Sequence, residues 1–346
     1  MSETAEARTE EREQPRMFDI RRYEFVMRAA QPIAHHAESI GNEAIVMRKK
    51  VRCKGGFALV PIISGDTMRH GMREAAAYAL LDAAGLLNDP QLTEAAIRLL
   101  FAGGMVTGKG EAAVVKLDQY REMCELVPSM ALFGGCANNR ILPGRLTVEE
   151  ATLICEEAAA DMPPWALDLH RKEYGDLDGC RAYVEEVQRV RMDPSLTPHV
   201  KALMAPSEQV EVNARLAASE QAHDELDHVG ADKAKSTMMP RRFERVCQGA
   251  LFSWGTQAIC QSDLDVDTLN VAAAAFLARA RVGGKRGTGH GLLVPIAARH
   301  IELLRPSDTS RPLDTKALAP KVGQLFRAHV AERSERIKSF LGTVNA

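Results

Sequence analysis

The most informative stretch of the sequence is VPIISGDTMRHGMR, residues 60–73, in which an extended apolar run leads directly into the start of a helix. The residues that follow, GMREAAAYALLDAA over 71–84, have the pattern of a helix, and Gly85 is expected to end it. We therefore expect a strand that passes into the first long helix of the fold at this point.

The start of this helix also carries residue types that bind phosphate. Helix N-termini present free amides and the positive end of the helix dipole to anions, and Ser, Thr and Arg are frequent phosphate partners. An ordinary N-cap at Asp66 or Thr67, with arginines on the surface, explains the same pattern. The candidate phosphate-binding residues are Ser64, Arg69, His70 and Arg73.

Outward from this stretch, the hydrophobic pattern predicts further strands and helices. Residues 22–30, RYEFVMRAA, alternate apolar and polar side chains, which is typical of a strand with one solvent-exposed face. Residues 43–52 and 57–63 are expected to be extended, with Gly55-Gly56 as the turn between them. Over the remaining chain we expect helices at 90–101, 111–126, 147–158, 268–280 (capped by Asp267) and 316–341, and strands at 244–253 and 292–297.

Residues 192–240 differ from the rest of the chain in composition. They are polar, are bounded by Asp193-Pro194 and Met239-Pro240, and show no strand pattern. We interpret them as an insertion that is helical over 208–228. The remaining order of strand, helix, long excursion, strand, helix and strand predicts an α+β fold, with an open ferredoxin-like or RNA-recognition-type sheet and its helices on one face.

The composition excludes several classes of protein. With 46% hydrophobic and 26% charged residues among 346, the chain is typical of a globular protein. No apolar run reaches the roughly 18 residues of a membrane span. The acidic N-terminus has no apolar core of a secretory signal, and we interpret residues 1–15 as a disordered leader. Seven cysteines without a CxxC pair favour a reducing compartment, so we expect a cytoplasmic location.

The net charge of −2 conceals basic clusters that are compatible with binding a polyanion. One cluster lies in the glycine-rich loop VGGKRGTGHG, residues 282–291. Glycine lets the backbone approach a ligand closely, and the interleaved cations supply charge, although a tight turn would need only two of these glycines. We favour contact with a phosphate backbone.

Three patterns suggest other chemistry, and each has a simpler explanation. GGMVTGKG (103–110) resembles a phosphate-binding loop but has glycine where a hydroxyl is needed, so we expect an inter-helix turn. The histidines of HDELDH (223–228) are five residues apart and would not converge on a helix. His35, His36 and Glu38 have no third partner evident in the sequence, so we favour backbone or phosphate contacts there and expect no metal or cofactor.

Four segments occur in a fixed order between residues 23 and 297: QPIAHHAESIGN (31–42), PIISGDTMRHGMR (61–73), ALFGGCANNRILPGRLTVEEA (131–151) and VGGKRGTGHG (282–291). Together they resemble the RAMP superfamily, specifically the multicopy backbone subunit of Class 1 CRISPR effector complexes, and most closely the type IV style. The resemblance implies an RNA-recognition-like palm with a helical fingers insertion (16–191 and 241–300), a thumb (192–240) and a C-terminal helical segment (301–346).

The resemblance also implies a function. Copies of such a subunit stack along a guide RNA (crRNA) as a helical filament, together with other CRISPR effector subunits, and the target nucleic acid pairs with the guide. The implied guide contacts are His35, His36, Ser64, Arg69, His70, Arg73, Gly283, Gly284, Lys285 and Arg286. Local charge adds Arg48, Lys50, Arg52 and Lys54, and Met238 and Met239 are candidates for an apolar wedge at the return of the thumb.

We expect no catalytic residues in this chain. Type III relatives carry an aspartate after the first strand that cleaves target RNA, whereas residues 37–43 contain no aspartate. The main alternative is a metal-dependent ribonuclease of the same fold that uses His35, His36 and Glu38. An unrelated nucleotide-binding enzyme that uses residues 103–110 is a third possibility.

Overall fold

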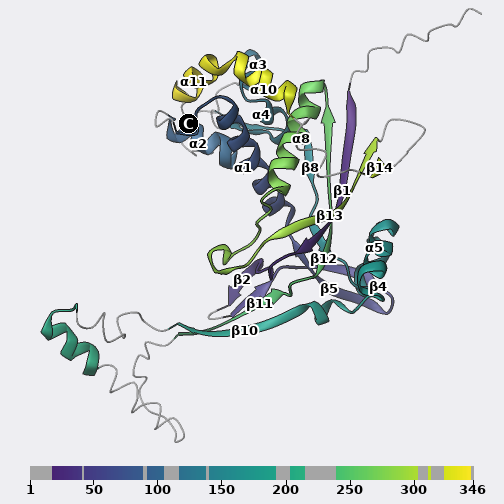
Figure 1. Ribbon diagram of the computed structural model, residues 1–346, viewed down its shortest axis with the longest axis vertical. Coiled ribbons are helices and arrows are strands. Elements are labelled where there is room, and N and C mark those ends of the chain that lie inside the picture. The colour runs from purple at the N-terminus through teal and green to yellow at the C-terminus, as the bar shows by residue number, and fades with distance from the viewer. Residues whose placement is uncertain are drawn as a thin grey trace, which may run out of the picture.

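The protein has an α+β fold in which an antiparallel sheet is packed against helices (Figure 1). Among the described residues, no helix combines the length and apolar character that a membrane crossing requires. The computed structural model describes residues 18–40, 43–88, 92–104, 117–137, 140–191, 203–214, 239–302, 311–312 and 323–343.

The main sheet is built around β1 (Asp19–Ala29), which confirms the first predicted strand. β1 pairs antiparallel with β12 (Leu251–Cys260) on one side and with β13 (Leu293–Glu302) on the other. The far edge of β12 pairs with the short strands β8 (Leu146–Val148) and β9 (Ala151–Leu153). The order β13–β1–β12–β8/β9 is that of a βαββαβ unit with an antiparallel sheet, which confirms the predicted α+β class.

The two long helices, α1 (Gly65–Ala83) and α8 (Asp263–Leu277), lie on one side of this sheet and α5 (Pro164–Tyr174) lies on the other (Figure 1). Neighbouring residues of β1 contact opposite layers: the Tyr23 hydroxyl donates to Asn270 of α8, and Trp165 of α5 donates to Glu24. The face of β1 that was expected to be exposed is therefore partly covered by α5.

The packing of α1 against α8 requires a small residue at their crossing. A Cβ atom on Gly71 would lie 2.5 Å from the ring of Phe276, which is 4% exposed in α8. Met68 and Met72 of α1 are fully buried in the same aliphatic core. Close approach of the two helices therefore depends on glycine at position 71.

Two further sheet elements extend from this core. The hairpin of β4 (Arg48–Cys53) and β5 (Gly56–Ile63) continues the main sheet beyond β9. A second sheet has the order β10–β11–β3–β2, and its long β10–β11 ribbon leads into and out of the predicted insertion (Figure 1). Its strands are β10 (Val184–Arg191), β11 (Met239–Val246), β3 (Glu43–Val46) and β2 (His36–Ile40).

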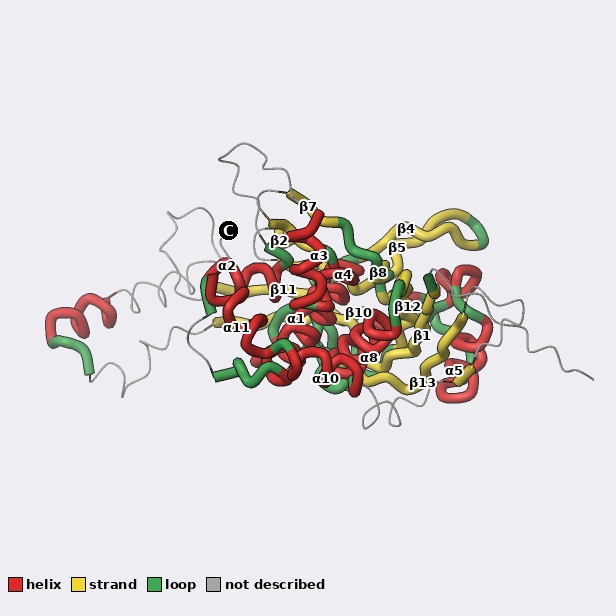
Figure 2. The backbone as a smooth tube through the Cα atoms, turned by 90° about the horizontal axis from the view of Figure 1, so that it is seen from above, coloured by secondary structure: helices red, strands yellow, loops and turns green. Residues whose placement is uncertain are grey.

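The remaining elements are short, and several form the helical group at one end of the molecule (Figures 1 and 2). They are α2 (Glu94–Ile97) with a π-helical turn (Arg98–Ala102), α3 (Leu117–Leu126), α4 (Pro128–Phe133), β6 (Gly135–Ala137), β7 (Arg140–Leu142), 3₁₀ turns at Glu156–Asp161, Cys180–Tyr183 and Arg286–Thr288, β14 (Arg311–Pro312), α10 (Gln324–Glu332) and α11 (Ser334–Thr343).

Two predicted elements are wrong in type or extent. The helix expected at 147–158 is instead β8, β9 and a 3₁₀ turn, because pairing with β12 and complete burial of Ala151–Leu153 outweigh helix propensity. The strand expected at 244–253 is interrupted by a turn at Gly249, whose φ is +94°, so β11 and β12 belong to different sheets.

The predicted boundaries of three helices also differ from the structure. Helix α2 begins after the N-cap Thr93 rather than at residue 90, and the C-terminal helix is divided at Arg333 into α10 and α11. Helix α8 is capped by Ser262, whereas Asp267 accepts hydrogen bonds from the backbone N–H groups of Gly323 and Phe326 at 2.8 and 2.9 Å. Asp267 thus holds the start of α10, an interaction between segments distant in the chain.

Candidate nucleic-acid interface

Three segments that the sequence singled out converge on one shallow groove of about 510 Å³. One segment follows β1, the second is the start of α1, and the third is the glycine-rich loop before β13. We call this feature the junction groove. It is lined by Ala34, His35, His36, Asp66, Thr67, His70, Gly283, Gly284 and Arg286.

Backbone hydrogen bonds hold the glycine-rich loop against the segment after β1. The N–H of Gly284 donates to the carbonyl of Ala34 at 2.8 Å. Gly283 has φ +72°, and a Cβ atom there would lie 2.7 Å from the same carbonyl oxygen. Both the backbone conformation and this close approach therefore require glycine at position 283.

The side chain of His35 connects the same segment to α1. Its Nε2 accepts a hydrogen bond of 3.2 Å from the backbone N–H of Ser64, and the residue is 9% exposed. Burial, and to a smaller extent the charge of His36, lower the pKa of His35 below its ordinary value. A neutral imidazole is consistent with this acceptor role, so His35 positions the start of α1.

The N-terminus of α1 is capped by Ser64 rather than by Asp66 or Thr67. The Ser64 hydroxyl accepts from the N–H of Thr67 at 3.2 Å and also contacts the Thr67 hydroxyl at 2.9 Å. His70, one turn later, is exposed and lines the groove. The positive end of the α1 dipole is thus directed at the groove, although Asp66 places one carboxylate beside it.

The glycine-rich loop supplies exposed cations to this region. Lys285 adopts a left-handed conformation (φ 57°), and its Nζ lies 4.1 Å from the centre of the Phe243 ring. The exposed side chain of Arg286 donates from Nε to the Gly283 carbonyl at 3.2 Å. Phe243 could not be predicted as a partner of this loop, because an apolar residue in a strand carries no signal for contact with a distant loop.

Arg69 and Arg73 do not line the junction groove. Arg69 donates to the carbonyls of Leu146 and Phe133, each at 2.6 Å, and Arg73 donates to those of Phe133 and Gly134 at 2.9 and 3.0 Å. Both guanidinium groups also lie over the Phe133 ring. Burial, followed by repulsion from Arg69, lowers the pKa of Arg73 to about 10. These contacts assign both arginines a role in holding residues 133–146 against α1.

The basic strand and the thumb residues lie outside the groove. Arg48 forms an ion pair with Glu244 at 2.9 Å, Lys50 lies 4.5 Å from the centre of the Phe57 ring, and Arg52 and Lys54 are exposed. The backbone of Met239 pairs with that of Arg191 in the β10–β11 ribbon. Met238, the leader, the 105–110 stretch and the 223–228 histidines lie outside the described residues.

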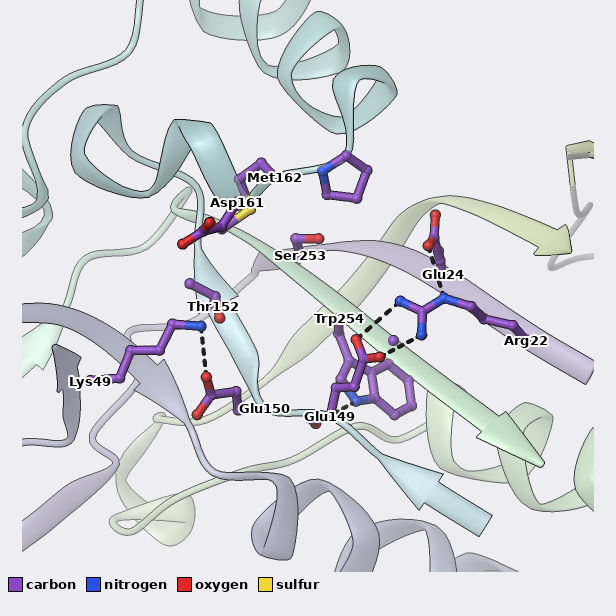
Figure 3. Close-up of a pocket in the computed structure, with 12 residues that line it drawn as sticks. Arg22, Glu24, Lys49, Glu149, Glu150, Thr152, Asp161, Met162, Ser253 and Trp254 are labelled. Carbon is purple, nitrogen blue, oxygen red and sulfur yellow. Dashed lines mark hydrogen bonds and ion pairs between the residues drawn. The ribbon is translucent and has the colours of Figure 1, made fainter. Parts of the chain in front are cut away.

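A separate pocket of about 340 Å³ lies between β1, β4, β12 and the segment 149–163 (Figure 3). Its cations are engaged by carboxylates: Arg22 is held by Glu24 and Glu149, and Lys49 by Glu150 at 2.6 Å. These ion pairs tie the hairpin and β1 to the connection between β8 and β9.

The described residues offer no grouping of three or more His, Cys, Asp or Glu side chains that would suit a metal ion. The Nε2 atom of His36 lies 2.9 Å from the Glu244 carbonyl oxygen, and the Nε2 atom of His35 is occupied by Ser64. The two histidines are therefore held by backbone groups on different elements, as the simpler of the two sequence interpretations expected.

Comparison with known proteins yields similarities to solved structures only. No family model matches the chain, and no curated protein matches it. Among solved structures, the chain is similar to one described as "Type IV-B CRISPR Complex", with a TM-score of 0.49 and 16% sequence identity, over 84% of this chain and 95% of that one.

Proposed function

We propose that the protein is a guide-RNA-binding backbone subunit of a CRISPR ribonucleoprotein, most like type IV, and that copies of it assemble along the guide. The observation that carries this proposal is the junction groove. Three segments meet in this groove, around residues 35, 66 and 284. The resemblance found in the sequence implies a guide contact for each of them. In this proposal the βαββαβ core is the palm and the segment between β10 and β11 is the thumb.

The chemistry of the groove suits an RNA backbone of any sequence. It combines a helix N-terminus, a glycine-rich backbone and cationic or imidazole side chains, which contact phosphates and 2′-hydroxyls rather than base edges. A subunit that holds many different guides requires contacts of this kind, because sequence is read by base pairing between guide and target. Other CRISPR effector subunits and the paired target are the remaining partners of the proposal.

The proposal is tested by purifying the full-length protein from a host that expresses a CRISPR array. We expect it to elute as a large assembly whose absorbance spectrum is that of a ribonucleoprotein and whose RNA, when sequenced, is guide RNA. A protein that elutes without nucleic acid and does not bind added guide would contradict the proposal. If the recovered RNA were random cellular RNA, the result would support RNA binding but contradict a preference for guide RNA.

We propose no catalysis by this subunit. The histidines of the ribonuclease alternative are already engaged, His35 with the backbone of Ser64 and His36 beside the Glu244 carbonyl. Incubating the assembled complex with labelled target RNA and Mg²⁺ tests this point. Discrete, evenly spaced cuts would favour the ribonuclease.

Deleting residues 195–236 and joining the ends through a short Gly-Ser bridge is expected to leave a folded monomer that no longer assembles. The backbones of Arg191 and Met239 are directly paired, so a short turn can close the ribbon without distorting it. Size-exclusion chromatography with light scattering gives the mass, and circular dichroism gives the secondary structure. Unchanged large assemblies with RNA would rule out the thumb assignment.

A further inference from the structure

The β4–β5 hairpin has one face on which cations and apolar residues stand side by side. The register of the two strands pairs Arg48 with Pro61, Lys50 with Leu59 and Arg52 with Phe57. Because directly opposite residues of an antiparallel pair share a face, the three cations form a column on β4 beside an apolar column on β5. The opposite face is turned into the core, where Val51 and Val60 are buried.

The outer part of this face is exposed. Phe57 is 63% and Leu59 60% exposed, which is unusual for two large apolar residues on neighbouring positions of one face. Residues 48–63 contain five cations and no acidic residue. Arg48, at the inner end, is held by Glu244 and borders a cavity of about 810 Å³. We define the hairpin face as Lys50, Arg52, Lys54, Phe57 and Leu59.

The β4–β5 hairpin projects from the rest of the backbone (Figure 2). At its base, the N–H of Met47 donates to the His35 carbonyl at 2.8 Å, and the N–H of Ile62 donates to the Met47 carbonyl at 2.9 Å. At about 3.3 Å per residue, six paired positions carry the turn roughly 20 Å from this base. The hairpin face is thus a surface distinct from the groove.

We propose that the hairpin face binds a single-stranded nucleic acid, with bases stacked on Phe57 and packed against Leu59 and with phosphates at Lys50, Arg52 and Lys54. Each nucleotide carries a flat apolar base next to a charged phosphate, and the face repeats this pairing across the two strands. Duplexes hide their base faces, so a stacking surface selects single strands and is tolerant of sequence. The inference goes beyond the guide contact in the groove and does not depend on it.

A protein partner fits the hairpin face less well. Protein interfaces concentrate apolar side chains at a centre depleted of charge, with charged residues at the rim. On the hairpin face every exposed apolar residue has a cation directly opposite, and Lys50 lies over the Phe57 ring itself. No apolar centre free of charge is present among these five residues.

The test measures binding of a short labelled oligouridylate, and of a duplex of equal length, to the purified full-length protein at several salt concentrations. Phe57→Ala is expected to weaken single-strand binding about tenfold, while Phe57→Trp, which keeps a stacking surface, preserves it. A double variant with Lys50→Gln and Arg52→Gln should lower the slope of log affinity against log salt concentration by about 1.4, which is roughly 0.7 for each lost phosphate contact. Ile141→Ala, which removes an apolar side chain that is 80% exposed on another hairpin, is the matched control and should change nothing.

The same measurements in a Lys285→Ala, Arg286→Ala background separate this site from the groove. A further loss of single-strand affinity on adding Phe57→Ala supports binding at the hairpin face. This holds even if Lys285→Ala and Arg286→Ala have no effect by themselves, a result that would count against the proposed function. Single-strand affinity unchanged by Phe57→Ala would overturn the inference. The inference would also be overturned if Phe57→Ala abolished self-association but left nucleic-acid affinity intact, because the hairpin face would then be a protein interface.

Discussion

Replacing Arg73 with alanine is expected to lower the free energy of unfolding by about 3 kcal/mol, because two charge-assisted hydrogen bonds to carbonyls are lost and one of these carbonyls keeps no arginine donor. The carbonyls belong to the buried residues Phe133 and Gly134, of which Phe133 still accepts from Arg69 at 2.6 Å. The Arg73 guanidinium also lies 5.4 Å from the centre of the Phe133 ring. Arg73→Lys should recover little of this loss, since an ammonium group lacks the planar fork that reaches both oxygens.

Urea titration followed by circular dichroism measures this change. Arg171→Ala is the matched control, because Arg171 forms an ion pair with Asp168 in which both side chains are more than half exposed, and such pairs contribute little. If Arg73→Ala were as stable as the control but had lost affinity for RNA with a lower salt slope, the structural role would be wrong and the phosphate contact implied by the sequence would be right.

The combined change Lys285→Ala and Arg286→Ala is expected to weaken guide binding at least about tenfold. The slope of log affinity against log salt should fall by about 1.4, because each lost phosphate contact of a single strand contributes roughly 0.7. Both residues are exposed on the glycine-rich loop, which is held on the Ala34 carbonyl by Gly284. The loss should be equal for guides of unrelated sequence, since phosphates carry no sequence information.

Fluorescence anisotropy with two unrelated guides at several salt concentrations checks this expectation. Arg171→Ala again serves as the control for removing a surface arginine outside the groove. An unchanged slope would remove Lys285 and Arg286 from the RNA path. Losses that differ strongly between the two guides would instead indicate that the loop reads base edges.

The elements predicted best are those with strong local signals. The alternation in β1, the glycine turn of the β4–β5 hairpin and the long helix α1 ended by Gly85 were all predicted from neighbouring residues. The prediction of a helix at 147–158 was wrong because the two short strands found there are stabilised by β12, about 100 residues away in the chain. Local propensity carries no information on such a partner.

Residue types at the site were easier to predict than their partners. His35, His70, Gly283, Gly284 and Arg286 were selected from the sequence, and the structure gathers them at the junction groove. Arg69 and Arg73 came from the same stretch, yet their guanidinium groups face carbonyls of the 133–146 segment. Helical spacing places these arginines on α1, but it does not say which neighbour they meet.

The α+β class and the segments rich in glycine and cations were therefore predictable from the sequence, because periodicity, turns and charge are local properties of a chain. The second strand position of the βαββαβ order, occupied by β8 and β9, was predicted as a helix. Three features are evident only in the folded protein: these segments meet at one groove, two arginines support a buried loop, and Asp267 holds α10 rather than capping α8. Each of these outcomes depends on contacts between residues far apart in sequence, which form when the helices and sheet bury their apolar faces together.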